Sequence, residues 1–185
     1  MSEKKSDFRF PMFESFKDKL KPNRSETQMA LANVRIFEKL SWSEIRSIEN
    51  SIHVRNFSPG ETVFKQGDPG SGMYIIVRGS VGIFLEIPNE EPQKLTELNE
   101  GDFFGEIALL DEAPRSAGAI AMESSAIIGF YRPDLMNLLQ IKPQLGAKIL
   151  LALSEVLATR LRATDEQLVK VTRQLSALMP KEDDV

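Results

Sequence analysis

Cysteine, histidine and long apolar stretches are scarce or missing in this chain of 185 residues. It contains no cysteine and a single histidine, His53. Disulfide bridges and cysteine-bound zinc are therefore excluded, and one imidazole cannot build a histidine cluster or a catalytic triad. No apolar run approaches the roughly 20 residues of a membrane span, and charged residues interrupt the N-terminus where a signal peptide needs an apolar core. We therefore expect a cytoplasmic protein with no transmembrane segment, no metal and no enzymatic activity.

An excess of positive charge is also missing. The formal net charge is −4, whereas a nucleic-acid-binding surface shows as a basic patch or stripe. We therefore expect no nucleic-acid partner. With 42% hydrophobic residues, the chain can bury a sizeable core, and its length fits one domain with appended segments.

The first 24 residues nevertheless carry a local excess of Lys and Arg, interleaved with aromatic side chains. Phe10, Phe13, Phe16 and Leu20 recur at intervals of three or four, which is a helical period. One interpretation is a helix that docks on a partner or a membrane surface. The other is a helix that folds back on its own domain, or a frayed tail. Residues 1–26 are thus expected to form an N-terminal extension, amphipathic or partly disordered.

Residues 27–142 change from a helical period to the period of strands. Ser41 and Glu44 have the spacing of a capping box at a helix start. From Ile52 to Tyr131, short segments of alternating polarity are separated by Gly- and Pro-containing turns. Many short strands of this kind predict a small antiparallel barrel behind a helical lead-in.

A long helix is predicted over residues 143–179, followed by a tail at 180–185. It would be about 50 Å long, more than a small barrel can cover. Its second half has the heptad spacing of a coiled coil: Leu157, Leu161, Thr164, Leu168, Val171, Leu175 and Leu178. We expect a parallel homodimer through residues 154–178, with an ion pair from Arg160 to Asp165 of the second copy. The alternative is a helix that packs entirely on its own barrel.

The chemistry of the chain is concentrated in residues 101–117. Gly105 permits a close backbone approach, and Glu106 can accept hydrogen bonds from a ligand hydroxyl. The short apolar run after Glu106 suits one helical turn, whose free N–H groups attract a phosphate. Arg115 supplies a planar fork for two phosphate oxygens. These residues together predict a pocket for a sugar phosphate.

Residues 104–109 and 114–117 resemble the phosphate-binding cassette of the cyclic nucleotide-binding domain family. The family pattern reads roughly F-G-E-L/I-A-L, then a few variable residues, then P-R-A/S/T-A, and this chain matches it without a gap. The family includes kinase regulatory subunits, cyclic nucleotide-gated channels and catabolite-activator-like regulators. The resemblance covers about residues 30–178. It implies an α+β fold: an antiparallel jelly-roll β-barrel with N-terminal helices and a long C-terminal helix.

The resemblance also implies a set of ligand-binding residues. They are Phe104, Gly105, Glu106, Ile107, Ala108, Arg115, Ser116, Ala117 and Thr164, with Leu95, Val81 and Arg160 as additional candidates. In this scheme Arg115 and the helical turn hold the cyclic phosphate, Glu106 holds the ribose 2′-hydroxyl, and Ser116 donates to the phosphate or the base. Thr164 approaches the adenine amino group, or else it bonds back to a carbonyl of its own helix.

The resulting hypothesis is a receptor for cAMP or cGMP, with cAMP slightly preferred, that signals to an unknown effector protein through ligand-dependent protein contact. A transcription factor is disfavoured because only residues 181–185 follow Pro180, too few for a recognition helix. The alternative is a scaffold or interaction protein whose pocket is idle or binds a cyclic dinucleotide.

Overall fold

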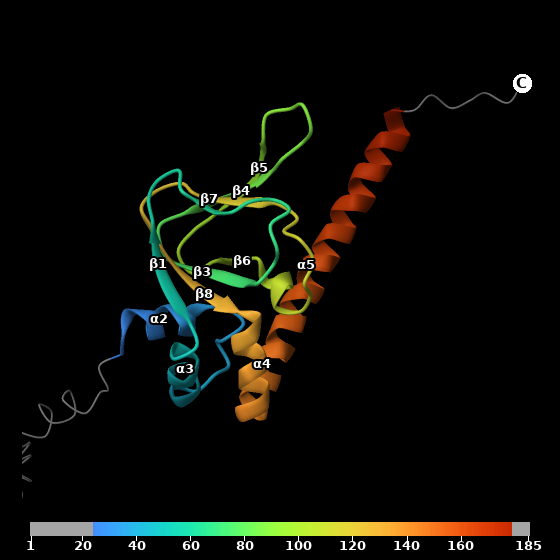
Figure 1. Ribbon diagram of the computed structural model, residues 1–185. Helices are drawn as coiled ribbons and strands as arrows, with labels where there is room; N and C mark the ends of the chain where they lie inside the picture. Colours follow the sequence, from blue (N-terminus) through green and yellow to red (C-terminus); the bar gives the residue numbers. More distant parts are fainter. Residues whose placement is uncertain (1–23, 179–185) are drawn as a thin grey trace, which may run out of the picture.

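The computed structural model describes residues 24–178, and in this part of the chain two antiparallel sheets face each other (Figure 1). The first sheet has the order β1-β8-β3-β6, with bounds His53–Phe57, Ser125–Tyr131, Gly72–Arg78 and Phe103–Phe104. The second has the order β2-β7-β4-β5, with bounds Thr62–Phe64, Gly118–Ala121, Val81–Leu85 and Gln93–Leu98. The predicted α+β fold with an antiparallel jelly-roll barrel is confirmed. The Phe-rich extension and the tail from Met179 lie outside the described residues.

The interior of the barrel is filled by side chains that alternate along the strands of both sheets. These are Phe57, Ile76, Val81, Phe104, Ala119, Ala121 and Ile127. Since successive side chains of a strand point to opposite faces, the neighbouring residues of β3 and β8 face the other way. Strands β3 and β8 are therefore buried on both faces, whereas the edge strand β1 is mostly exposed.

Four helices cover the outer face of this first sheet (Figure 1). They are α2 (Glu26–Asn33), α3 (Trp42–Glu49), α4 (Arg132–Ile141) and α5 (Pro143–Leu178). Their apolar faces form one cluster with the outward side chains of β3 and β8, which include Met73, Ile75, Ile128 and Phe130. The predicted capping box begins α3, because the amide and hydroxyl of Ser41 both donate to Glu44 at 2.8 Å.

Polar contacts join the first half of α5 to the helical lead-in. Lys148 pairs with Glu44 at 2.7 Å, and Lys39 pairs with Glu155 at 2.8 Å. The same part of α5 also buries apolar side chains in the helical cluster, namely Leu145, Ile149, Leu153 and Val156. The first half of α5 is thus fixed to its own domain by both apolar and charged contacts.

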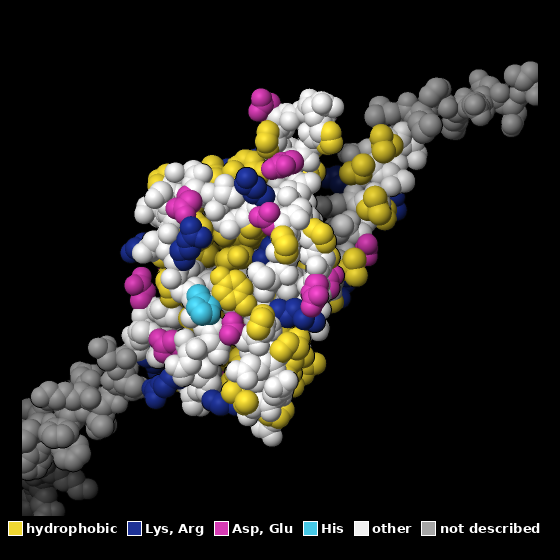
Figure 2. Space-filling model, in the orientation of Figure 1, with side chains coloured by type: hydrophobic (Ala, Val, Ile, Leu, Met, Phe, Trp, Pro, Cys, Tyr) yellow, Lys and Arg dark blue, Asp and Glu magenta, His cyan; other side chains and the backbone are white. Residues whose placement is uncertain are grey.

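The second half of α5 projects beyond the barrel (Figure 1). Every side chain from Arg160 to Ala177 is exposed, including the apolar Leu161, Leu168, Val171 and Leu175. Figure 2 shows yellow side chains along this segment. The apolar packing of the helix on its own domain therefore ends at about Leu157. Within residues 24–178, none of the helices combines the length and apolar character of a membrane crossing.

Candidate functional site

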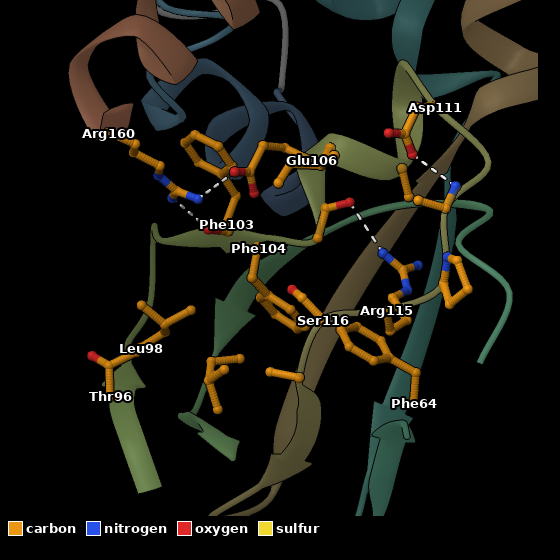
Figure 3. A pocket seen from close by; sticks show the side chains of 17 residues that line it. Phe64, Thr96, Leu98, Phe103, Phe104, Glu106, Asp111, Arg115, Ser116 and Arg160 are labelled. Atoms are coloured by element: carbon orange, nitrogen blue, oxygen red, sulfur yellow. Dashed lines mark hydrogen bonds and ion pairs between the residues drawn. The ribbon is translucent and has the colours of Figure 1, made fainter. Parts of the chain in front are cut away.

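A cavity of about 440 Å³ opens between the second sheet, the residues of the predicted cassette and the middle of α5 (Figure 3). This volume is in the range of pockets that hold small ligands. The residues that line it come from β2, β4, β5, residues 103–117 and α5: Phe64, Ile83, Thr96, Leu98, Phe103, Phe104, Gly105, Glu106, Ile107, Ala108, Asp111, Ala113, Pro114, Arg115, Ser116, Ala117 and Arg160. The cassette therefore forms one wall, and the strands and α5 supply the others.

Arg115 is held by the backbone of two other segments. Its own amide donates to Asp68 O at 2.9 Å, and its carbonyl accepts from Gly67 N at 2.9 Å. Its guanidinium donates through Nη2 to Gly72 O at 2.8 Å and through Nη1 to Gly105 O at 3.1 Å. The position of this side chain is thus set by the loop before β3 and by the cassette itself.

Arg115 is a buried cation that forms no ion pair within the described residues. The residue is 7% exposed, and its Nε finds no acceptor in this part of the chain. Burial lowers the pKa of the guanidinium, and the neighbouring Tyr74, Asp68 and Glu106 oppose that shift. Arginine remains charged in proteins despite such shifts. An anion in the cavity would therefore meet a positive charge that has no ion-pair partner among the described residues.

Glu106 lies at the other side of the cavity and is 4% exposed. Its Oε1 accepts a hydrogen bond from Nη1 of Arg160 at 2.5 Å, and Nη2 of Arg160 donates to Phe103 O at 3.3 Å. Figure 3 shows this pair apart from Arg115, with Phe104 and Ser116 between. Arg160 belongs to α5, so the pair joins the projecting helix to the cassette. It also leaves the second oxygen of Glu106 for another donor.

The second residue of the cassette is a glycine in the left-handed conformation. Gly105 has φ +71° and precedes η1 (Glu106–Leu109), a single 3₁₀ turn. A Cβ at Gly105 would lie 2.6 Å from Nη1 of Arg115, so the backbone approaches the guanidinium more closely than any side chain would permit. The predicted turn after Glu106 is present as this 3₁₀ turn.

Most of the predicted site residues lie together at the cavity. Those that line it are Phe104, Gly105, Glu106, Ile107, Ala108, Arg115, Ser116, Ala117 and Arg160. Val81 lies instead in the barrel interior. Leu95 is 51% exposed and lies outside the lining. Thr164 also lies outside it, and its hydroxyl donates to Arg160 O at 3.0 Å, which is the alternative that the sequence left open.

Arg160, which was expected to pair with Asp165 of a second copy, contacts Glu106 of its own chain, and the pair between copies stays a prediction. The reason is geometric, because Arg160 lies where α5 passes the cassette (Figure 3).

Thr96, Leu98, Ile83 and Phe64 line the cavity although the sequence did not single them out. Thr96 and Leu98 are two residues apart on β5, so their side chains share a face that Leu95 does not. The pairing of β4 with β5 shifts its register between Ile83 and Phe84. Such a bulge moves side chains to the other face, and only the alternation of Thr96 and Leu98 could have indicated which face is inside.

No group of three or more His, Asp or Glu side chains between residues 24 and 178 is placed to hold a metal ion. The polar groups of the cavity are instead two guanidinium groups, carboxylates and hydroxyls. Such a set can bind a ligand that carries both an anionic group and hydroxyls.

Comparison with known proteins places this geometry in a family. Residues 54–142 match the model of the family described as "Cyclic nucleotide-binding domain". The chain is 31% identical over 138 residues to the "CRP-like cAMP-activated global transcriptional regulator" of Mycobacterium tuberculosis, an alignment that covers 75% of this chain and 60% of that protein. It is 36% identical over 115 residues to the "cGMP-dependent protein kinase" of Plasmodium berghei, which covers 62% of this chain and 13% of that protein.

A solved structure shares the fold. The crystal structure of the Thermus thermophilus catabolite activator protein superposes with a TM-score of 0.68 at 30% sequence identity, covering 75% of this chain and 63% of that one. The chain spans about 60% of the length of the transcriptional regulator that it matches. Fold, cassette and cavity agree with these comparisons, and residues 54–142 of the chain form a domain of the cyclic nucleotide-binding domain family.

Proposed function

We propose that this protein is a receptor for a cyclic nucleotide. The observation that carries the proposal is Arg115, a buried guanidinium with no carboxylate partner among the described residues and with an unpaired Nε, in the wall of a cavity. A buried charge or donor without a partner is costly. A ligand phosphate would supply the missing negative charge and the acceptor.

The proposed ligand lies with its phosphate at Arg115 and its ribose at Glu106. Glu106 offers an acceptor and Arg160 offers a donor for the ribose 2′-hydroxyl. The hydrogen bond between them, at 2.5 Å, holds the two groups side by side. Ser116 is adjacent to Arg115 and donates to the phosphate or the base. The first-turn amide of Ile107 adds to the phosphate seat.

The purine is proposed to lie against Ile83 and Leu98, with the hydroxyl of Thr96 near its edge, because these residues form the apolar wall opposite the cassette. We propose cAMP as the preferred ligand and cGMP as the second choice. The names of the relatives include both ligands. Thr164 remains a proposed base contact only if α5 moves closer to the cavity on binding.

The output is proposed to pass through protein contact rather than through chemistry on a substrate or through nucleic acid. The exposed apolar stripe of α5 is self-complementary at heptad spacing, which favours a parallel homodimer through residues 154–178. On composition alone we place this receptor in the cytoplasm, with an effector protein as its further partner. The alternative is an interaction protein whose pocket binds a cyclic dinucleotide or stays idle.

Arg115→Leu tests the phosphate assignment. Removing the charged fork should weaken cAMP binding by at least about 100-fold, since a charge-assisted bidentate contact and its orientation are lost together. Isothermal titration calorimetry with cAMP, cGMP and a cyclic dinucleotide gives the affinities, and thermal unfolding checks the fold. Arg55→Leu is the matched control, because its guanidinium is exposed and lies over Phe57, outside the cavity lining.

Unchanged affinity in Arg115→Leu would refute the phosphate assignment. Tighter binding of the dinucleotide than of cAMP or cGMP would favour the alternative.

A further inference from the structure

Tyr74 of β3 is close to Arg115 although it does not line the cavity. The centre of its ring lies 5.5 Å from Cζ of Arg115, and the ring of Phe64 lies 4.2 Å from the same atom. A guanidinium this close to an aromatic ring is attracted by the negative face of the ring, most strongly when water is excluded. Because Arg115 is buried, both rings act on a desolvated cation.

The ring of Tyr74 is itself fixed by its neighbours. Phe104 stacks on it at 5.5 Å with an interplanar angle of 22°, and Tyr131 meets it edge-on at 6.3 Å and 89°. In the β3–β8 ladder Tyr74 is paired with Gly129. A Cβ at Gly129 would lie 2.7 Å from Oη of Tyr131, so the missing side chain provides the room that Tyr131 occupies beside Tyr74.

The hydrogen bonds of Arg115 leave its orientation incompletely determined. Nη1 and Nη2 each donate to one carbonyl oxygen, and Nε has no acceptor among the described residues. Two directional bonds to backbone oxygens hold the end of the side chain, but without a third bond at Nε they constrain the guanidinium plane only in part. A ring with a fixed orientation beside that plane supplies the missing restriction.

We propose that Tyr74 is a positioning residue for the ligand anion: its ring, held by Phe104 and Tyr131, keeps the guanidinium of Arg115 in the orientation that receives a phosphate. This inference rests on the proposed function, since it names how the phosphate seat is prepared. The effect is assigned to the face of the ring, although the hydroxyl of Tyr74 also interacts with the guanidinium, and Tyr74→Phe separates the two contributions.

Three variants separate positioning from general damage to the core. Tyr74→Leu removes the ring, Tyr74→Phe keeps it, and Phe130→Leu removes a fully buried ring from the opposite face of the same sheet. By calorimetry, Tyr74→Leu should bind cAMP about tenfold more weakly, the size expected for a desolvated cation–π contact. Tyr74→Phe should stay within about twofold of wild type, because the ring face is retained.

Phe130→Leu should lose thermal stability and keep its affinity. Wild-type affinity in Tyr74→Leu, or an equal loss of affinity in Phe130→Leu, would overturn the proposal.

A ligand-free measurement keeps this inference distinct from the proposed function. The Nε–Hε resonance of Arg115, assigned by its absence in Arg115→Leu, can be followed by proton–nitrogen correlation NMR. In wild type and in Tyr74→Phe it should be a distinct, ring-shifted signal, and in Tyr74→Leu it should move to the position of solvent-exposed arginines or broaden.

If wild type binds neither cAMP nor cGMP while this signal depends on the ring of Tyr74, the proposed function fails and the positioning of Arg115 stands. If wild type binds and the signal does not depend on the ring, only the positioning fails.

Discussion

Gly105 places the backbone of the cassette in direct contact with the guanidinium of Arg115. Its φ of +71° is one that side chains with a Cβ rarely adopt, and an added Cβ would lie 2.6 Å from Nη1. Gly101 offers a comparison four residues earlier, because it has φ +87° and nothing within 4 Å of an added Cβ. The two glycines therefore share the backbone strain but differ in what a methyl group would contact.

We predict that Gly105→Ala lowers ligand affinity and Gly101→Ala does not. Both variants should lose about 1 kcal/mol of stability from the left-handed backbone. Only Gly105→Ala should also displace Arg115 and weaken cAMP binding, by about tenfold or more if the phosphate contact lengthens. Denaturant unfolding gives the stabilities and calorimetry the affinities. Equal affinities in the two variants would contradict this account of Gly105.

The residues of the cassette could be predicted from the sequence because they are contiguous. Residues 104–117 carry the glycine, the acid and the arginine in one short run, and the structure places all three at one cavity. Leu95 was predicted for the facing wall and lies outside the cavity lining, and the register shift between Ile83 and Phe84 cannot be read from a pattern of alternation. Tyr74 was not singled out because its contact with Arg115 joins residues 41 positions apart.

Among the helices, α3 and α5 are held together by charge as well as by apolar packing. The pKa of Glu44 is lowered from 4.5 to about 2, first by its bond to Lys148 and then by bonds from the amide and hydroxyl of Ser41. A lowered pKa means that the folded protein favours the charged form. The stabilisation from Glu44 is therefore present above pH 4.5 and is lost as the pH falls towards 2.

Glu44→Gln should accordingly destabilise the protein at pH 7 by about 1 kcal/mol, a value kept small because Lys148 is half exposed. Glutamine still serves as the third residue of a capping box, so the variant removes mainly the charge. Urea unfolding at pH 7 and at pH 3 should show the difference from wild type shrinking at the lower pH. Glu166→Gln, in the exposed second half of α5, should differ little at either pH; a constant deficit in Glu44→Gln would argue against the charged contact.

The described residues form two unlike regions: a barrel covered on one face by helices, and the second half of α5, whose side chains are exposed. The heptad spacing of residues 157–178 could be read from the sequence. The residue at which α5 leaves its own domain could not, because it depends on where the barrel ends in three dimensions. Leu168 lies on the proposed dimer seam and is 64% exposed, and Val169 lies beside the seam and is 49% exposed.

We predict that Leu168→Asp abolishes dimerisation and Val169→Asp does not. A charge on the seam would be buried against a second apolar seam, which is costly, whereas a charge at the neighbouring position would remain in water. Sedimentation velocity at several protein concentrations, with and without cAMP, measures the oligomeric state. A monomeric wild type, or equal dissociation by both variants, would rule out the proposed seam.

The contact between Arg160 and Glu106 couples the cavity to the middle of α5, so a small tilt of the helix at Arg160 would move its far end by a larger distance. From Arg160 to Leu178 the helix extends about 27 Å at 1.5 Å per residue, and a tilt of about 10° would carry its tip about 5 Å. No glycine or proline interrupts it after Gly146 to absorb such a movement. A small displacement of Arg160 at the cavity would therefore produce a larger displacement of the exposed end of α5, which a second protein bound to that end could detect.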